Sequence, residues 1–185
     1  MITKEYRKEL LDIHANTDWG VTGGVYCGDS VIEFIKAFPV KTILDYGCGE
    51  GSLKKWVEDA GITDLEWTQY DPGMPEFQKR PEGTFDLVVT TDVLEHVEDD
   101  MLDAVIDDLY SFTGKYIYNA IACYLARATF ADGPYKGQDL HLSLKAPDEW
   151  MLRLARPYMG VISSHACVHY GWKVRYLSTQ ERIGK

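Results

Sequence analysis

Long apolar runs are absent from this 185-residue sequence, and their absence excludes a membrane-spanning helix. Such a helix needs roughly 18 or more consecutive apolar residues, and no stretch approaches that length. The first residues become charged at Lys4 and Glu5, and they include no apolar segment that resembles a signal peptide. We therefore expect a cytoplasmic protein without a membrane segment.

Cysteine is scarce, and the four cysteines lie far apart at positions 27, 48, 123 and 167. No CxxC pair occurs, which argues against a zinc knuckle or a disulfide framework. Reduced thiols in the cytoplasm fit this pattern best.

Basic residues are also few: 19 lysines and arginines face 29 acidic residues, for a net charge of −10. A protein that grips long nucleic acid needs a basic surface to neutralise phosphates, so we expect a small-molecule partner instead. The length and an apolar content of 45% indicate a single globular domain over residues 1–185.

Strand-like and helical segments alternate along the chain. The helical spacing of Tyr6, Leu10 and Ile13, and then of residues 32, 35 and 38, predicts two helices within residues 1–39. Later helices are expected over 52–60 and 97–112 and near 147–150, and strands over 40–44, 65–70, 85–91, 116–121, 161–168 and 172–177. This order predicts an α/β fold: a mostly parallel sheet with helices on both faces and a C-terminal antiparallel hairpin around His169 to Gly171.

An acidic residue stands at the end of each of the first three predicted strands: Asp45, Asp71 and Asp92. Right-handed crossovers bring the carboxyl ends of parallel strands to one edge of the sheet, where ligands bind. We therefore expect the binding site at this edge.

The first of these acids begins a glycine-rich turn, Asp45-Tyr-Gly-Cys-Gly-Glu-Gly51. Glycines permit a sharp turn and a close approach of ligand to backbone. A dinucleotide-binding fingerprint would read G-x-G-x-x-G, but its last glycine is replaced here by Ser52. Taken alone, the loop is equally consistent with a structural turn, and Asp71 is equally consistent with a solvated acid. Together they favour a nucleoside ligand, with Asp71 accepting hydrogen bonds from the ribose hydroxyls.

These segments resemble the class I S-adenosylmethionine (SAM)-dependent methyltransferases. Residues 45–51 match the first motif of that family, Tyr70-Asp71-Pro72 its ribose-binding strand end, and 85–89 its fourth strand. The resemblance implies a Rossmann-like sheet, a small-molecule methyl acceptor and SAM as cofactor, whose ammonium and sulfonium charges suit an acid at Asp45. It implies the following cofactor-binding residues: Asp45, Tyr46, Gly47, Cys48, Gly49, Gly51, Asp71, Pro72, Thr91 and Asp92.

The sequence departs from the family between the ribose acid and the fourth strand. The family inserts a helix and a strand there, but residues 72–84 are too few for both. We therefore predict six strands rather than seven, with the 85–91 strand beside the 40–44 strand. The usual polar residue that reads adenine has no counterpart, and Phe77 or Met74 is a candidate to cover the base.

A metal site is a further candidate. Asp92, Glu95 and His96 have the i, i+3, i+4 spacing of one helix face, and His141 is a distant fourth candidate ligand. The pattern resembles the Mg²⁺ or Mn²⁺ sites of small-RNA 2′-O-methyltransferases and ubiquinone-pathway O-methyltransferases, and it implies metal-assisted O-methylation. Alternatively, Glu95 and His96 cap a helix, while His141 acts as a general base or packs beneath Trp150.

Two loops are candidate lids, residues 20–24 and 122–140, and the 122–158 region is the candidate acceptor-side insertion. Either acceptor binding or core packing explains a set of aromatic residues, Trp19, Tyr124, Tyr135 and Trp150. His14, His165 and His169 are expected in structural or surface roles. The main alternative to an enzyme is a SAM-binding sensor or a non-catalytic partner subunit, since fold alone does not separate these functions.

Overall fold

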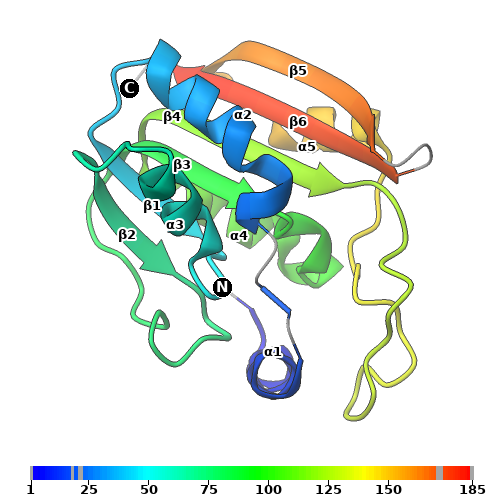
Figure 1. Ribbon diagram of the computed structural model, residues 1–185. Coiled ribbons are helices and arrows are strands. Elements are labelled where there is room, and N and C mark those ends of the chain that lie inside the picture. Colours follow the sequence, from blue (N-terminus) through cyan, green and yellow to red (C-terminus); the bar gives the residue numbers. More distant parts are fainter. Residues whose placement is uncertain (1, 18, 21–22, 170–172, 184–185) are drawn as a thin grey trace.

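A computed structural model describes all residues except 1, 18, 21–22, 170–172 and 184–185 (Figure 1). Its centre is a six-stranded sheet with the strand order β2-β1-β3-β4-β6-β5. The strands are β1 (Thr42–Tyr46), β2 (Glu66–Tyr70), β3 (Phe85–Thr91), β4 (Thr113–Ala122), β5 (Met159–His169) and β6 (Lys173–Arg182).

The four strands β2, β1, β3 and β4 are parallel, whereas β6 runs antiparallel to both of its neighbours, β4 and β5. The six-stranded prediction is confirmed, and residues 72–84 contain no helix or strand. Strand β3 lies beside β1, with Leu44 opposite Val88. The C-terminal strands are longer than expected, and the turn that we placed around His169 to Gly171 falls largely on residues outside the described part.

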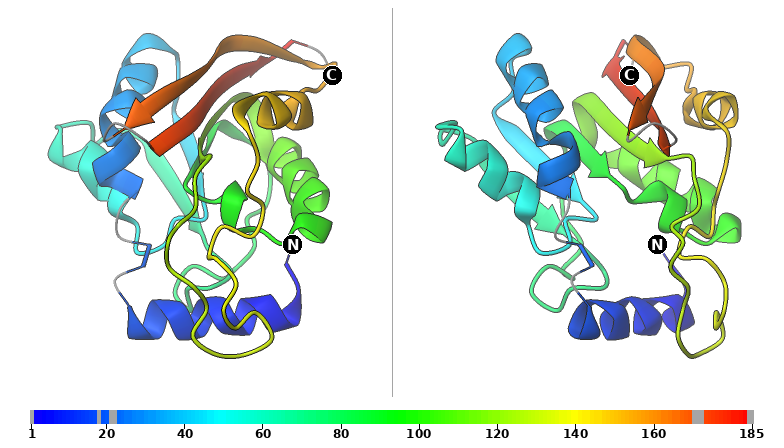
Figure 2. Two further views of the ribbon diagram at one scale, coloured as in Figure 1. Left: turned by 90° about the vertical axis from the view of Figure 1, so that its right-hand side faces the viewer. Right: turned by 45° about the vertical axis from the view of Figure 1, so that its right-hand side comes forward.

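Helices cover both faces of the sheet, as predicted (Figure 2). On one face, α2 (Gly23–Ala37) and α3 (Ser52–Asp59) pack over a core that includes Val31, Ile43 and Leu87. On the other, α4 (Asp99–Phe112) and α5 (Pro147–Leu154) bury Leu102, Ile106 and Trp150. The i, i+4 spacing of such residues gives α4 one apolar face, which is why this segment packs flat on the sheet.

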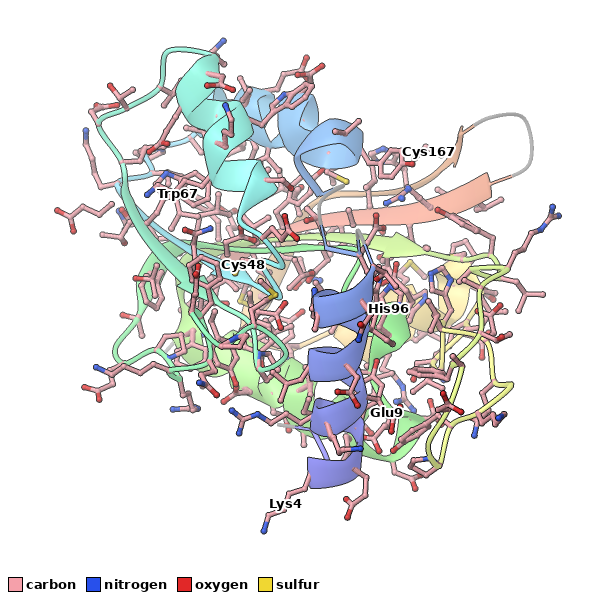
Figure 3. The ribbon with its side chains drawn as sticks, turned by 60° about the horizontal axis from the view of Figure 1, so that its bottom comes forward. Lys4, Glu9, Cys48, Trp67, His96 and Cys167 are labelled. Carbon is pink, nitrogen blue, oxygen red and sulfur yellow. The ribbon has the colours of Figure 1, made fainter. Side chains whose placement is uncertain are left out.

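The first helix, α1 (Lys4–Asn16), lies on neither face. It crosses the carboxyl edge of the parallel strands beside the 123–146 loop (Figures 2 and 3). A third, smaller hydrophobic cluster joins the two, with Tyr6 and Leu10 of α1 packed near Phe130 of the loop. The helix is also tied down by hydrogen bonds, because the Tyr6 hydroxyl donates to the His96 carbonyl oxygen at 2.5 Å and Arg7 Nε to the Pro72 carbonyl oxygen at 3.1 Å. We call α1 and the 123–146 loop the cap.

The cap includes only part of residues 1–39, where we expected two helices, and only part of the 122–158 region, the candidate acceptor-side insertion. Helix α2, within residues 1–39, belongs to the sheet layer, and so does α5, within residues 122–158. Both bury apolar side chains that only the sheet can cover. In the described part of the chain, none of the helices combines the length and apolar character that crossing a bilayer requires.

Candidate functional site

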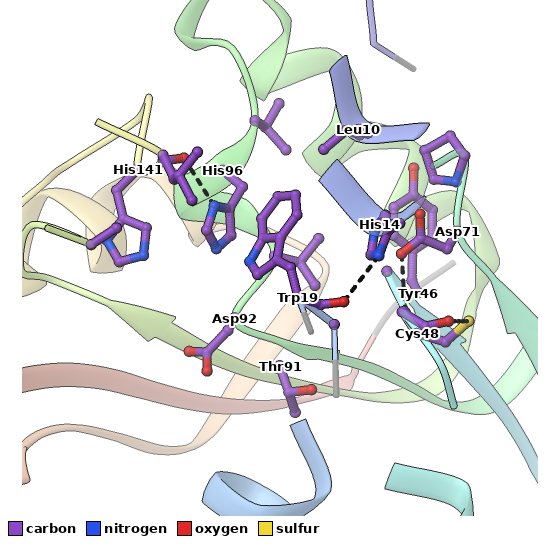
Figure 4. Close-up of a pocket in the computed structure, with 18 of the residues that line it drawn as sticks. Leu10, His14, Trp19, Tyr46, Cys48, Asp71, Thr91, Asp92, His96 and His141 are labelled. Atoms are coloured by element: carbon purple, nitrogen blue, oxygen red, sulfur yellow. Dashed lines mark hydrogen bonds between the residues drawn. The ribbon is translucent and has the colours of Figure 1, made fainter. Parts of the chain in front are cut away.

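A cavity of about 300 Å³ lies between the cap and the carboxyl ends of the parallel strands (Figure 4). The strand-end acids Asp45, Asp71 and Asp92 all line it. The predicted placement of a pocket at this edge therefore agrees with the structure. Of the expected cofactor-binding residues, nine line the cavity: Asp45, Tyr46, Gly47, Cys48, Gly49, Asp71, Pro72, Thr91 and Asp92. Gly51 does not; it is the N-cap of α3.

The glycine loop forms the floor of the cavity with bare backbone. Gly47 and Gly49 have φ angles of +77° and +51°, which favour glycine. A Cβ on Gly47 would lie 2.5 Å from Val93 Cγ2, and one on Gly49 would lie 2.4 Å from the carbonyl oxygen of Gly20. Any side chain at these two positions would collide with its surroundings. The glycines therefore leave the loop backbone open to close approach by a ligand.

Asp45 is a buried acid at the start of this floor. It is 1% exposed, and its Oδ2 has no hydrogen-bond partner among the described residues. Burial, together with the charge of Asp71, raises its pKa to about 7. A buried carboxyl without a partner is costly, which makes Asp45 a natural counter-charge for a cationic ligand.

Asp71 organises the loop from the end of β2. Its Oδ2 accepts a hydrogen bond from Gly49 N at 3.0 Å, and its Oδ1 accepts one from Gly73 N at 2.7 Å. Burial raises the pKa of this carboxyl, while the two backbone donors oppose that rise. Each oxygen keeps a second lone pair for a ligand.

Two residues of the N-terminal region stand above Asp71 and the loop. His14 and Trp19 stack with ring centroids 5.3 Å apart, and His14 Nδ1 lies 3.1 Å from the Trp19 carbonyl oxygen. Trp19 also meets the His96 ring edge-on at 4.7 Å. Its indole therefore lies between the Asp71 side and the His96 side of the cavity (Figure 4). Sequence reasoning gave His14 a structural or surface role and missed its place here.

Asp92 is engaged by an arginine that the sequence did not single out. Both carboxylate oxygens of Asp92 accept hydrogen bonds from Arg175 of β6, with Nη2 2.8 Å from Oδ2. Arg175 is 3% exposed and also lies over the Tyr26 ring, 5.0 Å from its centroid. Its place follows from the pairing of Ala122 with Arg175, a long-range register that no local pattern reveals.

The α-helical turn that we expected from Asp92 to His96 is absent, although Asp92 and His96 line the same cavity. Asp92 has a φ of +56°, and only Leu94–His96 form a short 3₁₀ helix, so Asp92 opens no α-helical turn. The candidate ligand group in the described residues consists of Glu95, His96 and His141, whose ligand atoms all lie within 4.8 Å of one another.

Backbone contacts orient the two histidines of this group. His96 Nδ1 lies 2.9 Å from the Leu140 carbonyl oxygen, and His141 Nδ1 lies 2.5 Å from that of Tyr124. Because a carbonyl only accepts, each Nδ1 carries the proton and each Nε2 keeps its lone pair. Burial lowers the pKa of His96 to about 3 and also lowers that of His141. Both imidazoles are therefore neutral near pH 7.

Glu95 is the third member of this group, but unlike the two histidines it does not line the cavity. It is fully buried, its Oε1 accepts from Ala122 N at 2.8 Å, and its Oε2 has no hydrogen-bond partner among the described residues. Burial raises the pKa of this carboxyl well above its usual value, and the charge of Asp92 adds to the rise. A buried carboxyl close to two neutral imidazoles is a set of groups that can hold a divalent cation.

The aromatic candidates separate into two pairs. Trp19 and Tyr124 line the cavity. Trp150 belongs to α5 and is fully buried in the core, and Tyr135 packs against Tyr6 inside the cap. Met74 and Phe77, the candidates to cover adenine, do not line the cavity. The lid segment 20–24 is described only in part, and its Gly20 lies against Gly49.

Comparison with protein families decides the class to which this site belongs. The model of a family described as "Methyltransferase domain" matches residues 24–136, which is more than half of the chain. The chain belongs to this methyltransferase family. The match spans the glycine loop, the three strand-end acids and the Glu95-His96 pair, and it omits α1 and the C-terminal strands.

Solved structures share the fold of this methyltransferase. N-methyltransferase NodS from Bradyrhizobium japonicum, in complex with S-adenosylhomocysteine (SAH), is 12% identical, with a TM-score of 0.63 over 98% of this chain and 100% of that one. The 1,6-didemethyltoxoflavin-N1-methyltransferase of Burkholderia thailandensis is 14% identical, with a TM-score of 0.65 over 96% and 87%. DhpI in complex with SAH is 17% identical, with a TM-score of 0.61 over 99% and 100%. No curated protein matches the sequence significantly.

The floor of the cavity yields a first prediction about this methyltransferase. Gly49→Ala should lower the free energy of unfolding more than Gly83→Ala does. Both glycines have positive φ, so both substitutions cost about 1–2 kcal/mol in backbone strain. Only at Gly49 does the new Cβ meet a backbone oxygen, which adds roughly 1–3 kcal/mol. Urea unfolding of the two variants measures the difference, and equal losses would contradict the close approach of Gly20.

The pKa of Asp45 yields a second prediction. Between the unfolded value of 3.8 and the folded value of about 7, the native state binds a proton that the unfolded state has lost. Stability due to this group therefore falls as pH rises through that window. Asp45→Asn removes the effect, so the variant should gain stability relative to the parent from pH 4 to pH 7, by at most about 4 kcal/mol. Urea unfolding across this range tests it; a difference that stays constant with pH would refute the assignment.

Proposed function

We propose that the chain binds SAM and transfers its methyl group to a small-molecule acceptor. The observation that carries this proposal is the buried, unpartnered Asp45 oxygen at the start of a glycine floor with no room for a side chain. SAM carries an ammonium group whose positive charge would pair with Asp45. Its methionine part is narrow enough to lie against a backbone without side chains. The fold supports the proposal, because NodS and DhpI share it and their structures contain SAH.

The residues present fit this cofactor. Asp45 would pair with the ammonium group, and the backbone of Gly47 and Gly49 would lie along the methionine part. Asp71 would accept hydrogen bonds from the ribose hydroxyls, using the oxygen lone pairs that Gly49 N and Gly73 N leave free. When bound, SAM supplies a methyl group on a positively charged sulfur that is easily displaced. The chain's own task is then to align the acceptor with that methyl group and to exclude water, which the cap is placed to do.

An acceptor has room on the His96 side of the cavity. Tyr124, Ala126 and Ala128 of the cap line it together with the two histidines. Arg175 is already paired with Asp92, so its charge is balanced before an acceptor enters. An acceptor without a phosphate or carboxylate group suits this surface best, in keeping with the net charge of −10.

The ribose assignment gives a third prediction. Asp71→Ala should weaken SAH binding by about 1–3 kcal/mol, or roughly 5- to 150-fold, because buried hydroxyls lose their acceptor. Isothermal titration calorimetry on the folded variant measures this, with Asp64→Ala, an exposed acid, as the control that should bind normally. Unchanged affinity in the Asp71 variant would remove the assignment, and tighter binding of NAD than of SAM to the parent would overturn the cofactor.

Catalysis itself is tested with methyl-labelled SAM and pooled metabolites and nucleosides. The parent protein should form a labelled product, and the Asp45→Asn variant should not. SAM binding without any labelled product across the pool would favour the alternative, a SAM-binding sensor or a non-catalytic partner subunit.

We further propose that Glu95, His96 and His141 hold a divalent metal ion, which makes the reaction an O-methylation. One ligand atom of each of the three residues lies within 4.8 Å of the other two, and Oε2 of Glu95 has no hydrogen-bond partner among the described residues. Two imidazoles in a set of three favour Mn²⁺ over Mg²⁺, which prefers oxygen alone. A bound ion would lower the pKa of an acceptor hydroxyl. With a pKa of about 3, His96 is a better ligand than general base.

The metal proposal gives a fourth prediction. Mn²⁺ titration followed by electron paramagnetic resonance should show one site in the parent protein. His141→Ala should weaken it at least tenfold, as loss of one of three protein ligands does, and Glu95→Gln should do the same. His165→Ala, which removes an exposed histidine of β5, should leave it intact. Equal Mn²⁺ affinity in all four proteins would exclude the site, and His141 would then remain a candidate general base.

A further inference from the structure

The two edges of the sheet differ in how they are protected. At one edge, β2 has only five residues, begins at Glu66 and is flanked by Asp64 and Asp71. Short length and charge are the usual means by which a native sheet prevents an edge strand from pairing with another chain. The β2 edge is therefore protected in the usual way.

The other edge lacks that protection. Strand β5 has eleven residues, and it lies outermost in the sheet, beyond β6 (Figure 1). Residues 157–172 contain no Asp, Glu, Lys or Arg, although about four would be expected among sixteen residues at a charged content of 26%. Strand β5 also contains no proline. A single irregularity of register between Val161 and Ser163 interrupts its pairing with β6, and pairing is regular from Ser163 onward.

Exposed apolar side chains gather around the start of this edge. Val161 is 62% exposed and Ile183 is 63% exposed, and Ile183 lies against Gly160 of β5. Helix α5, which packs beside β5, presents Leu152 at 72% exposure and Met151 at 46%. Exposed apolar side chains thus lie on the uncharged edge strand, on the residue beside it and on the helix that contacts it, as they do at interfaces.

We propose that β5 pairs with β5 of a second copy of this chain, antiparallel and about a two-fold axis, so that two sheets join into one. A two-fold axis sets the same strand against itself, so the side-chain pattern matches itself without a separate partner sequence. The row of outward N–H and C=O groups on each edge would then be paired.

Charge favours a second copy over a different partner at this edge. A chain with a net charge of −10 repels its own copies over most of its surface. The sixteen-residue segment without charge is where two copies meet without placing like charges face to face. An edge that bound an acidic partner would carry basic residues, and one that bound a basic partner would carry acidic residues. The β5 edge carries neither kind.

The interface leaves the cavity free. Strand β6 lies between β5 and β4, and β4 precedes the loop that holds Tyr124. Methyl transfer and pairing are therefore separable, and the proposal stands or falls independently of the proposed function.

Light scattering after size-exclusion chromatography tests the proposal on the whole chain. The parent should have a mass of two 21.0-kDa chains, falling towards one on dilution. Ala166→Lys, at an exposed position of β5, adds a positive charge to each of the two paired strands and should weaken association at least tenfold. Val161→Lys is a second variant, at a side chain 62% exposed, in case the first fails to fold. Glu66→Lys on the β2 edge is the control and should remain a dimer.

Hydrogen exchange distinguishes this pairing from other dimers. Backbone amides between residues 163 and 167 should exchange more slowly at high protein concentration, and those of β2 should not change. A monomer at every concentration would overturn the proposal. So would a dimer that both lysine variants of β5 leave intact, or one that Glu66→Lys abolishes.

Discussion

The site depends on the carboxylate of Asp71, which holds two backbone amides at once. By accepting from Gly49 N and Gly73 N, it ties the glycine floor to the end of β2 and fixes the turn that leaves β2. The glycine loop in turn meets Gly20, whose carbonyl oxygen lies only 2.4 Å from where a Cβ on Gly49 would be. Trp19, next to Gly20, reaches His96 across the cavity. The Asp71 carboxylate thus fixes the position of the glycine loop, and the N-terminal segment around Gly20 packs against that loop.

The features that sequence predicted well are those encoded by local pattern. Strand-end acids, glycines at turns and the alternation of strand and helix are read within a few residues, and the shared edge of parallel strands then brings Asp45 and Asp71 together. The shortness of residues 72–84 likewise fixed the number of strands, because a chain of that length has no room for another helix and strand. These predictions needed no knowledge of distant contacts.

The features that sequence missed arise from pairing between distant segments. Arg175 reaches Asp92 only because β6 enters the sheet antiparallel to β4. That ion pair leaves Asp92 outside the group of Glu95, His96 and His141, which the i, i+3, i+4 spacing did not foresee. His14 enters the cavity because the apolar side of α1 packs on the 123–146 loop, and the cluster that joins them exists only in three dimensions. Local periodicity can predict α1 but not what it covers.

Two of the hydrogen bonds that hold helix α1 end on backbone carbonyl oxygens, which every residue possesses. The Tyr6 hydroxyl binds the carbonyl oxygen of His96 and not its ring, and Arg7 Nε binds the carbonyl oxygen of Pro72. Backbone acceptors persist when a side chain is replaced. A substitution at residue 96 therefore keeps the acceptor that holds Tyr6 of α1. It removes only the contacts that the His96 ring itself makes, with the Leu140 carbonyl oxygen and the Trp19 ring.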